Sequence, residues 1–177
     1  MEDFWYRRAM DDVDEPLDRV ASIRADWRRE RPDLDTSPQG VIGRVHRLGL
    51  ALSARIAEVH ADHGLNESEF DLLATLRRAG APYERPAGEL AAHTMVTTGG
   101  LTKRVDRLVE RGLVERDVSP GDARRRLVRL TPAGRDLIDR AFTAHIENER
   151  RLVDELGAED AAALEQILTR WLRVLGD

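Results

Sequence analysis

The chain has no cysteine and no long apolar run, and it holds few aromatic residues. The absence of Cys among its 177 residues excludes disulfides, thiolate zinc sites and thiol-based redox sensing on this chain. No stretch of about 18 apolar residues is present, so we expect no membrane span. The N-terminal MEDFWYRRAMDD is charged and lacks the apolar core of a secretory signal, which favours a cytoplasmic protein.

Enzyme signatures are missing as well. The sequence shows no nucleophile elbow, P-loop or dinucleotide fingerprint. His60 and His63, with Glu58 and Asp62 near them, resemble a metal-binding pair at the end of a predicted helix, but the sequence places no third ligand. We therefore expect no enzyme, no cofactor and no metal, and keep a metal site at the two histidines as the alternative.

What the chain does contain favours helices. Apolar residues make up 41% and charged residues 34% of the sequence, which is typical of a helix-rich protein. Apolar spacing predicts a helical extension over residues 3–30, a linker at 31–38 and then a long helix that ends near Gly64. Asn66 and Glu69 have the spacing of a capping box, so we expect the next helix to begin there.

A helix-turn-helix and a hairpin are predicted next. GAPYERP is expected to be a loop, GELAAH a short helix, MVT a tight turn, and residues 97–112 a second helix. Residues 113–118 and 126–130 are alternating or β-branched, and the turn residues SPGDARR lie between them, which predicts a wing. The fold class is therefore mainly α with a small β-hairpin wing: a winged helix-turn-helix with long N- and C-terminal dimerisation helices.

The terminal helices carry more apolar surface than one compact domain needs. Leu164, Leu168 and Trp171 lie on one stripe of the last helix, and such a stripe usually packs against a second subunit. We expect a homodimer, and the alternative is that these helices pack only on their own core. The expected segments are an N-terminal helical extension at 1–36, a dimerisation and linking helix at 37–64, a DNA-binding lobe at 65–131 and C-terminal dimerisation helices at 132–177.

Positive charge is concentrated in the helix-turn-helix and the wing. The whole chain has a net charge of −5, whereas residues 103–129 hold nine Lys or Arg against five Asp or Glu, a local excess of four positive charges. Phosphate contact needs only such a local stripe. Double-stranded DNA is therefore the expected partner, and the alternative is an ordinary solvated charged face.

The second helix of the helix-turn-helix has the pattern of a recognition helix. On a helical wheel Leu101, Val105 and Leu108 form a narrow inward stripe, and polar side chains lie opposite. Small residues at its start would let the helix N-terminus approach phosphate, and the arginines that follow Asp122 in the wing suit the minor groove. The expected DNA-binding residues are Thr97, Thr98, Gly100, Thr102, Lys103, Arg107, Arg124 and Arg125.

These segments resemble the MarR family of regulators. The resemblance covers the layout from Val41 to the C-terminus and is sharpest in NESEFDLLATL and in the run from GELAAHTMVTTGGLTKRVDRLVERG through the wing to LTPAGR. It implies a winged-helix dimer on a pseudo-palindromic operator, usually a repressor that a small molecule releases.

The N-terminal extension and its DW…RPDLD segment are similar to the urate-responsive MarR subgroup. That resemblance implies an anion site at Trp27, Asp71, Arg104 and Arg116. The wheel places Arg104 at the edge of the buried face, but it predicts that Asp71 is a surface acid.

Several alternatives remain open at this point. Trp27 could serve only in packing, and Arg116 could be a surface residue or a phosphate contact. The effector could be another purine, a phenolic carboxylate or a tricarboxylate. An architectural DNA-binding protein without an effector is the alternative from a different class.

Overall fold

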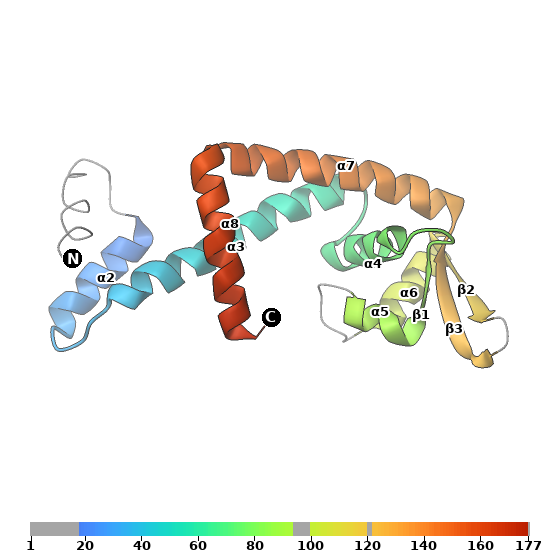
Figure 1. Ribbon diagram of the computed structural model, residues 1–177, viewed down its shortest axis with the longest axis horizontal. Helices are drawn as coiled ribbons and strands as arrows, with labels where there is room; N and C mark the ends of the chain where they lie inside the picture. The colour runs from blue at the N-terminus through green and yellow to red at the C-terminus, as the bar shows by residue number, and fades with distance from the viewer. Residues whose placement is uncertain (1–17, 94–99, 120–121, 177) are drawn as a thin grey trace. The chain divides into compact units, whose positions relative to one another are not determined.

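The computed structural model describes residues 18–93, 100–119 and 122–176, and it confirms a mainly helical fold with one small sheet (Figure 1). The helices are α2 (Arg19–Glu30), α3 (Ser37–Asp62), α4 (Glu67–Arg78), α5 (Ala87–His93), α6 (Leu101–Glu110), α7 (Pro132–Asp154) and α8 (Ala158–Leu175). The strands are β1 (Glu84–Pro86), β2 (Val114–Ser119) and β3 (Asp122–Leu130). None of the helices in the described ranges combines the length and the apolarity that a membrane crossing requires.

The chain forms two compact units, residues 1–53 and 54–177, and the boundary between them lies within α3. In the first unit, α2 and the start of α3 approach closely because Gly43 has no side chain and the buried Val20 occupies that space. Arg44 Nε donates a 2.7 Å hydrogen bond to Asp18, which also caps α2 by accepting from Ala21 N. The predicted helix over 3–30 is thus confirmed for Arg19–Glu30, and the rest of that range lies outside the described residues.

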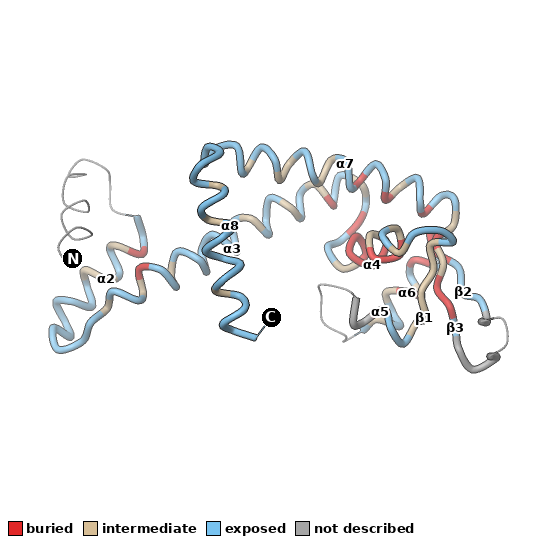
Figure 2. The backbone as a smooth tube through the Cα atoms, in the orientation of Figure 1, coloured by how far each residue is buried: buried red, intermediate tan, exposed pale blue. Residues whose placement is uncertain are grey.

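The core of the second unit lies between α4, α6, α7 and the sheet. Leu73, Leu76, Leu108 and Ile138 are fully buried there, and Figure 2 shows the buried segments gathered on α4, on the strands and on the adjoining half of α7. Each such side chain contributes about 2 kcal/mol through its removal from water. This burial holds the helix-turn-helix, the wing and α7 together.

The capping box at the start of α4 is confirmed. The Asn66 side chain accepts from Glu69 N at 2.9 Å, and Glu69 Oε2 accepts from Asn66 N at 3.2 Å. These two bonds satisfy backbone donors that a helix start would otherwise leave unpaired. They fix the point at which α4 begins.

The sheet has the order β1-β3-β2 and is antiparallel throughout. The prediction that GAPYERP is entirely a loop is wrong, because its last three residues form β1 and pair with β3. The strand is short and ends in Pro86, a residue that strand patterns normally exclude but that an edge strand tolerates. A three-residue edge strand gives too little alternation to be predicted from sequence.

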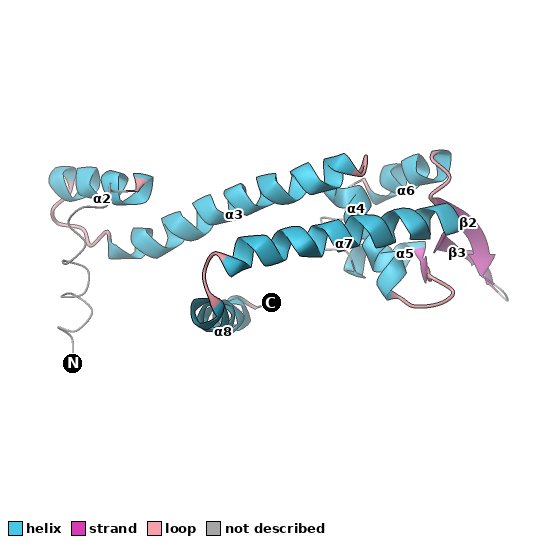
Figure 3. Ribbon diagram, turned by 90° about the horizontal axis from the view of Figure 1, so that it is seen from above, coloured by secondary structure: helices cyan, strands magenta, loops and turns pink. Residues whose placement is uncertain are grey.

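The last two helices extend from this lobe. Figure 3 shows α8 nearly end-on while α7 lies across the view, so the two helices cross steeply. No residue of α8 is buried in the single chain. Its exposed large apolar side chains are Ile167, Leu168, Leu172, Val174 and Leu175.

His60, at the end of α3, is packed as a neutral ring. Its side chain stacks on Phe70 with a centroid distance of 3.9 Å, and its Nε2 lies 3.3 Å from Nδ1 of His145. Burial, assisted by the nearby His145 and His63, lowers the pKa of His60 from 6.5 to about 4. Among the described residues no cluster of three or more His, Cys, Asp or Glu side chains could hold a metal ion, which leaves the alternative metal site without support.

Acidification is expected to destabilise the protein through His60. The unfolded His60 binds a proton near pH 6.5 and the folded one near pH 4, so between these values the unfolded chain holds more protons. This group therefore lowers the free energy of unfolding by roughly 3 kcal/mol as the pH falls through that window, and the loss is complete below about pH 4. Urea unfolding of the wild type and of His60→Leu at stepped pH values measures it. Parallel pH profiles for the two proteins would contradict the prediction.

Candidate nucleic-acid interface and effector residues

Helix α6 presents a cationic face over a buried apolar stripe. Val105 and Leu108 are buried, whereas Thr102, Lys103 and Arg107 are exposed, as the wheel predicted. The helix begins at Leu101, later than predicted, and Gly100 before it has a left-handed backbone with φ 84°. A hollow of about 500 Å³ on this surface is lined by Gly100, Lys103, Arg104, Asp106, Arg107 and Glu110.

Two groups of expected DNA contacts fall outside this description. Thr97 and Thr98 lie outside the described residues. Arg124 and Arg125 lie in β3, and the structure describes their backbone but not their side chains. Their DNA-binding roles stay predictions.

The buried carboxylate of Glu69 fastens the end of α6 to the start of α4. Arg111 Nη1 donates to Glu69 Oε2 at 3.3 Å, and Arg111 Nη2 donates to Gly64 O at 3.0 Å. Arg107 Nε lies 3.7 Å from the other oxygen of Glu69. Arg107 therefore shares its charge with the protein, and less of that charge is available to phosphate. Sequence reasoning missed this second role of Glu69, since the capping box already accounted for an acid at that position.

An ion pair joins the wing to α6. Arg116 Nη1 in β2 lies 2.5 Å from Asp106 Oδ1 in α6, and Arg116 Nη2 donates to Thr102 O at 3.5 Å. The two side chains are roughly one-third to one-half exposed. This contact couples the position of the strand to that of the helix. An anionic ligand at Arg116 would compete with Asp106.

The positive charge of Arg129, at the base of the wing, is neutralised by acids on the two neighbouring strands, β1 and β2. Arg129 in β3 forms a two-point contact with Glu84 of β1, at 2.7 Å through Nε and 2.5 Å through Nη2. Asp117 and Glu115 of β2 lie 3.6 and 3.7 Å from its guanidinium group. The hydrogen bond to Glu84 raises the pKa of Arg129 above its usual range. Arg129 thus holds the strands together and adds little net positive charge for DNA.

The structure corrects the placement of Asp71. The wheel predicted a surface acid, but Asp71 is only 8% exposed. Helix α4 contacts α5, α6, α7 and the sheet, so other elements cover more of its surface than its apolar face alone. Arg104, in contrast, is half-buried at the edge that the wheel predicted.

The four residues assigned to an anion site by resemblance come from both units. Asp71, Arg104 and Arg116 lie in the second unit, and Trp27, with 48% exposure, lies in the first. Each unit is described by itself. Their joint role as an effector site stays a prediction.

Sequence comparison finds transcription regulators. Residues 63–125 match the profile of the MarR family. The HTH-type transcriptional regulator PecS of Dickeya dadantii (strain 3937) is 38% identical over 151 residues, which cover 85% of this chain and 91% of PecS. MhqR of Bacillus subtilis (strain 168), also an HTH-type transcriptional regulator, is 28% identical over 108 residues, covering 61% of this chain and 72% of MhqR.

Solved structures agree with these matches. A mutant MarR from Escherichia coli, crystallised with operator DNA, is similar with a TM-score of 0.64 and 26% identity, covering 82% of this chain and 97% of that one. A MarR-like transcription regulator from Bacillus cereus ATCC 10987 has a TM-score of 0.71 over 80% of this chain and all of its own, but only 17% identity, so it supports the fold alone.

Proposed function

Because the chain belongs to the MarR family of winged helix-turn-helix transcription regulators, we propose that it is a homodimeric repressor released from a pseudo-palindromic operator by a small anionic ligand. The relatives described above are regulators and not enzymes. The observation that carries the proposal is the cationic face of α6, fastened to a wing by Arg116 and Asp106.

In the proposed complex α6 enters the major groove. Lys103 and Thr102 are exposed on its outer face, where they would meet base edges or phosphates. Gly100 leaves room for the backbone to approach phosphate, as Thr97 and Thr98 would, and the wing carries Arg124 and Arg125 toward the minor groove. A dimer would place its two α6 helices roughly 34 Å apart, one turn of DNA.

Exposed apolar residues support the proposed homodimer. In the second unit α8 exposes a stripe that includes Ile167, Leu168 and Leu172, and in the first unit α3 exposes Val41 and Val45. Contiguous apolar surface of this kind usually marks a subunit interface. The regulator would work in the cytoplasm, where its operator lies.

The proposed effector is urate or a related anion held by Trp27, Asp71, Arg104 and Arg116. Two features of the second unit support a link to DNA binding: Arg104 belongs to α6, and Arg116 contacts α6 through Asp106. A ligand that draws on either arginine would move the recognition helix. A coupling of about 1–3 kcal/mol would change operator affinity several-fold to a hundredfold. Two functions compete with this one. The first is a MarR-type regulator that responds to a different carboxylate or phenol, and the second is an architectural DNA-binding protein without an effector.

Operator binding with and without urate tests the proposal. DNA from upstream of the protein's own gene is expected to bind in a salt-sensitive manner, and urate is expected to weaken binding of the wild type. Arg104→Ala should keep the fold and much of the DNA affinity but lose the urate response, because half-buried Arg104 faces the protein more than the exposed Lys103 does.

Each part of the proposal has its own contrary result. An equal urate response in wild type and Arg104→Ala would refute the effector role of Arg104. A monomer in sedimentation without affinity for any duplex would refute the proposed function as a whole.

A further inference from the structure

Two arginines at the end of α6 share one buried acid. Arg107 Nε lies 3.7 Å from Glu69 Oε1, and Arg111 Nη1 donates to Glu69 Oε2 at 3.3 Å. The cluster therefore carries one positive charge, where the two arginines alone would carry two. Arg107 is the outward member, because its side chain is 54% exposed and lines the hollow on α6 together with Lys103. Glu69 thus removes positive charge from the proposed DNA surface from below.

The carboxylate of Glu69 is held in place. Only 7% of its side chain is exposed, and its Oε2 also accepts from Asn66 N at 3.2 Å. Arg111 Nη2 donates to Gly64 O at 3.0 Å, so Arg111 is tied to the turn before α4. Solvent and salt screen a buried charge less than an exposed one. Glu69 therefore acts on Arg107 more strongly than a surface acid at the same distance would.

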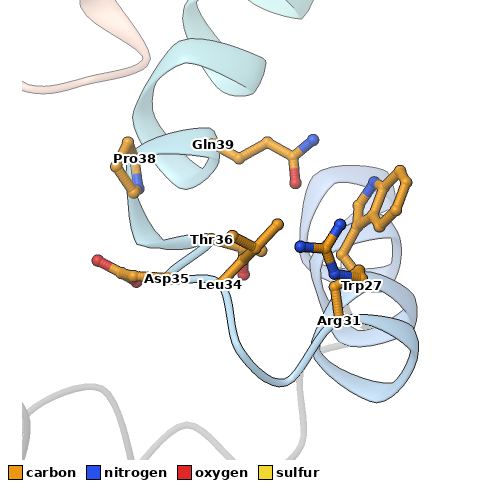
Figure 4. Close-up of a pocket in the computed structure, with 7 residues that line it drawn as sticks. All are labelled: Trp27, Arg31, Leu34, Asp35, Thr36, Pro38 and Gln39. Carbon is orange, nitrogen blue, oxygen red and sulfur yellow. The ribbon is translucent and has the colours of Figure 1, made fainter.

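An arginine of the first unit has a partner of the weaker, exposed kind. Arg31 lines a pocket of about 360 Å³ at the turn between α2 and α3, and Figure 4 shows its guanidinium group beside the Trp27 ring. Asp33 lies 2.6 Å from Arg31, but both side chains are about half exposed. Water and salt screen such a pair, so an incoming anion displaces its acid at little cost. The burial of Glu69 protects it from that competition.

We propose that Glu69 is an internal counterion that lowers the sequence-independent affinity of this regulator for the DNA backbone. The role rests on the proposed function, since it concerns the same α6 surface. Affinity for the backbone comes from protein cations that neutralise phosphates and release counterions from the duplex. Arg107 already has an anion beside it, so its approach to a phosphate gains less than the approach of Lys103 does. A phosphate contact carries no sequence information, so Glu69 weakens binding to an operator and to any other duplex alike.

Glu69→Gln tests the proposal through the salt dependence of DNA binding. The amide oxygen can still accept from Asn66 N, and both arginines are partly exposed, so the variant should fold. At low salt we expect it to bind a duplex of unrelated sequence about tenfold more tightly than the wild type does. The slope of log affinity against log salt concentration should steepen by about one to two for a dimer. Fluorescence anisotropy with labelled operator and labelled unrelated duplex, at stepped salt concentrations, measures both.

Two further variants assign the effect to the pair of Glu69 and Arg107. Glu67→Gln makes the same change in net charge at an exposed position of α4 and should leave the slope unchanged. Adding Arg107→Gln to Glu69→Gln should return the slope to the wild-type value, which a change in stability alone would not do. An unchanged slope in folded Glu69→Gln, an equal gain in Glu67→Gln, or a gain confined to the operator would overturn the proposal.

A comparison of two single variants serves if Glu69→Gln does not fold by circular dichroism. Arg107→Gln should lose less than half of the salt slope that Lys103→Gln loses, because Glu69 already offsets the charge of Arg107. Equal losses would reject the role of Glu69. If the wild type binds no duplex at all, the proposed function fails and this role fails with it. Contrary results in a wild type that does bind DNA reject only the role of Glu69.

Discussion

Lys103→Glu is expected to lower operator affinity about 1,000-fold, roughly 4 kcal/mol. Lys103 is exposed on the outer face of α6 and belongs to the hollow that this face forms. The substitution replaces an attraction to phosphate or guanine by a repulsion, and a dimer suffers the change in both half-sites. Fluorescence anisotropy with labelled operator at one fixed salt concentration measures the loss.

Arg150→Glu is the matched control for this experiment. Arg150 is exposed near the C-terminal end of α7, and that end extends away from α6 and the wing (Figure 1). The substitution therefore changes the net charge as much as Lys103→Glu does but leaves the proposed DNA surface unaltered. We expect its operator affinity to stay within a few-fold of the wild type. Similar losses for the two variants would mean that net charge, and not α6, governs binding.

Gly134→Ala is expected to destabilise the fold by about 4 kcal/mol, at the upper end of single-substitution effects. A Cβ at Gly134, in the first turn of α7, would collide with the backbone carbonyl oxygen of Leu113. That backbone has little freedom to move, because Leu113 O accepts from Thr131 N at 3.1 Å and the Thr131 hydroxyl donates to Gly112 O at 2.7 Å. Chemical denaturation measures the change in the free energy of unfolding.

Gly88→Ala is the control for the glycine substitution. Gly88 is exposed in α5, and nothing lies within 4 Å of the position that its Cβ would take. Alanine favours a helix over glycine by up to about 1 kcal/mol, so this variant should be as stable as the wild type or slightly more so. A Gly134→Ala protein within 1 kcal/mol of wild type would show that α7 shifts to make room at little cost.

The sequence predicted well those elements whose signals are local. The apolar stripe of α6 and the capping box of Asn66 and Glu69 depend on neighbours within a few residues, and the structure confirms both. The boundaries of α6 were less accurate, because its glycines give no apolar period from which a start could be read.

Features that depend on distant contacts could not be predicted. Asp71 is buried because other elements surround α4 on several sides, which a helical wheel does not describe. His60 is buried by Phe70 and His145, the latter 85 positions further along the chain. The pocket at Trp27 depends on how the turn before α3 returns to α2, which spacing alone does not determine.

The ion pair between Arg116 and Asp106 has a consequence for experiments that count phosphate contacts. Such counts come from the steepness with which affinity falls as ions are added, on the assumption that only counterions on the duplex are displaced. Here the wing is braced against α6 by a partly exposed pair at 2.5 Å, and added ions weaken that brace as well. The number of phosphate contacts inferred from the salt dependence would therefore exceed the true number. In Asp106→Asn, which lacks the ion pair, the inferred number should lie closer to the true one.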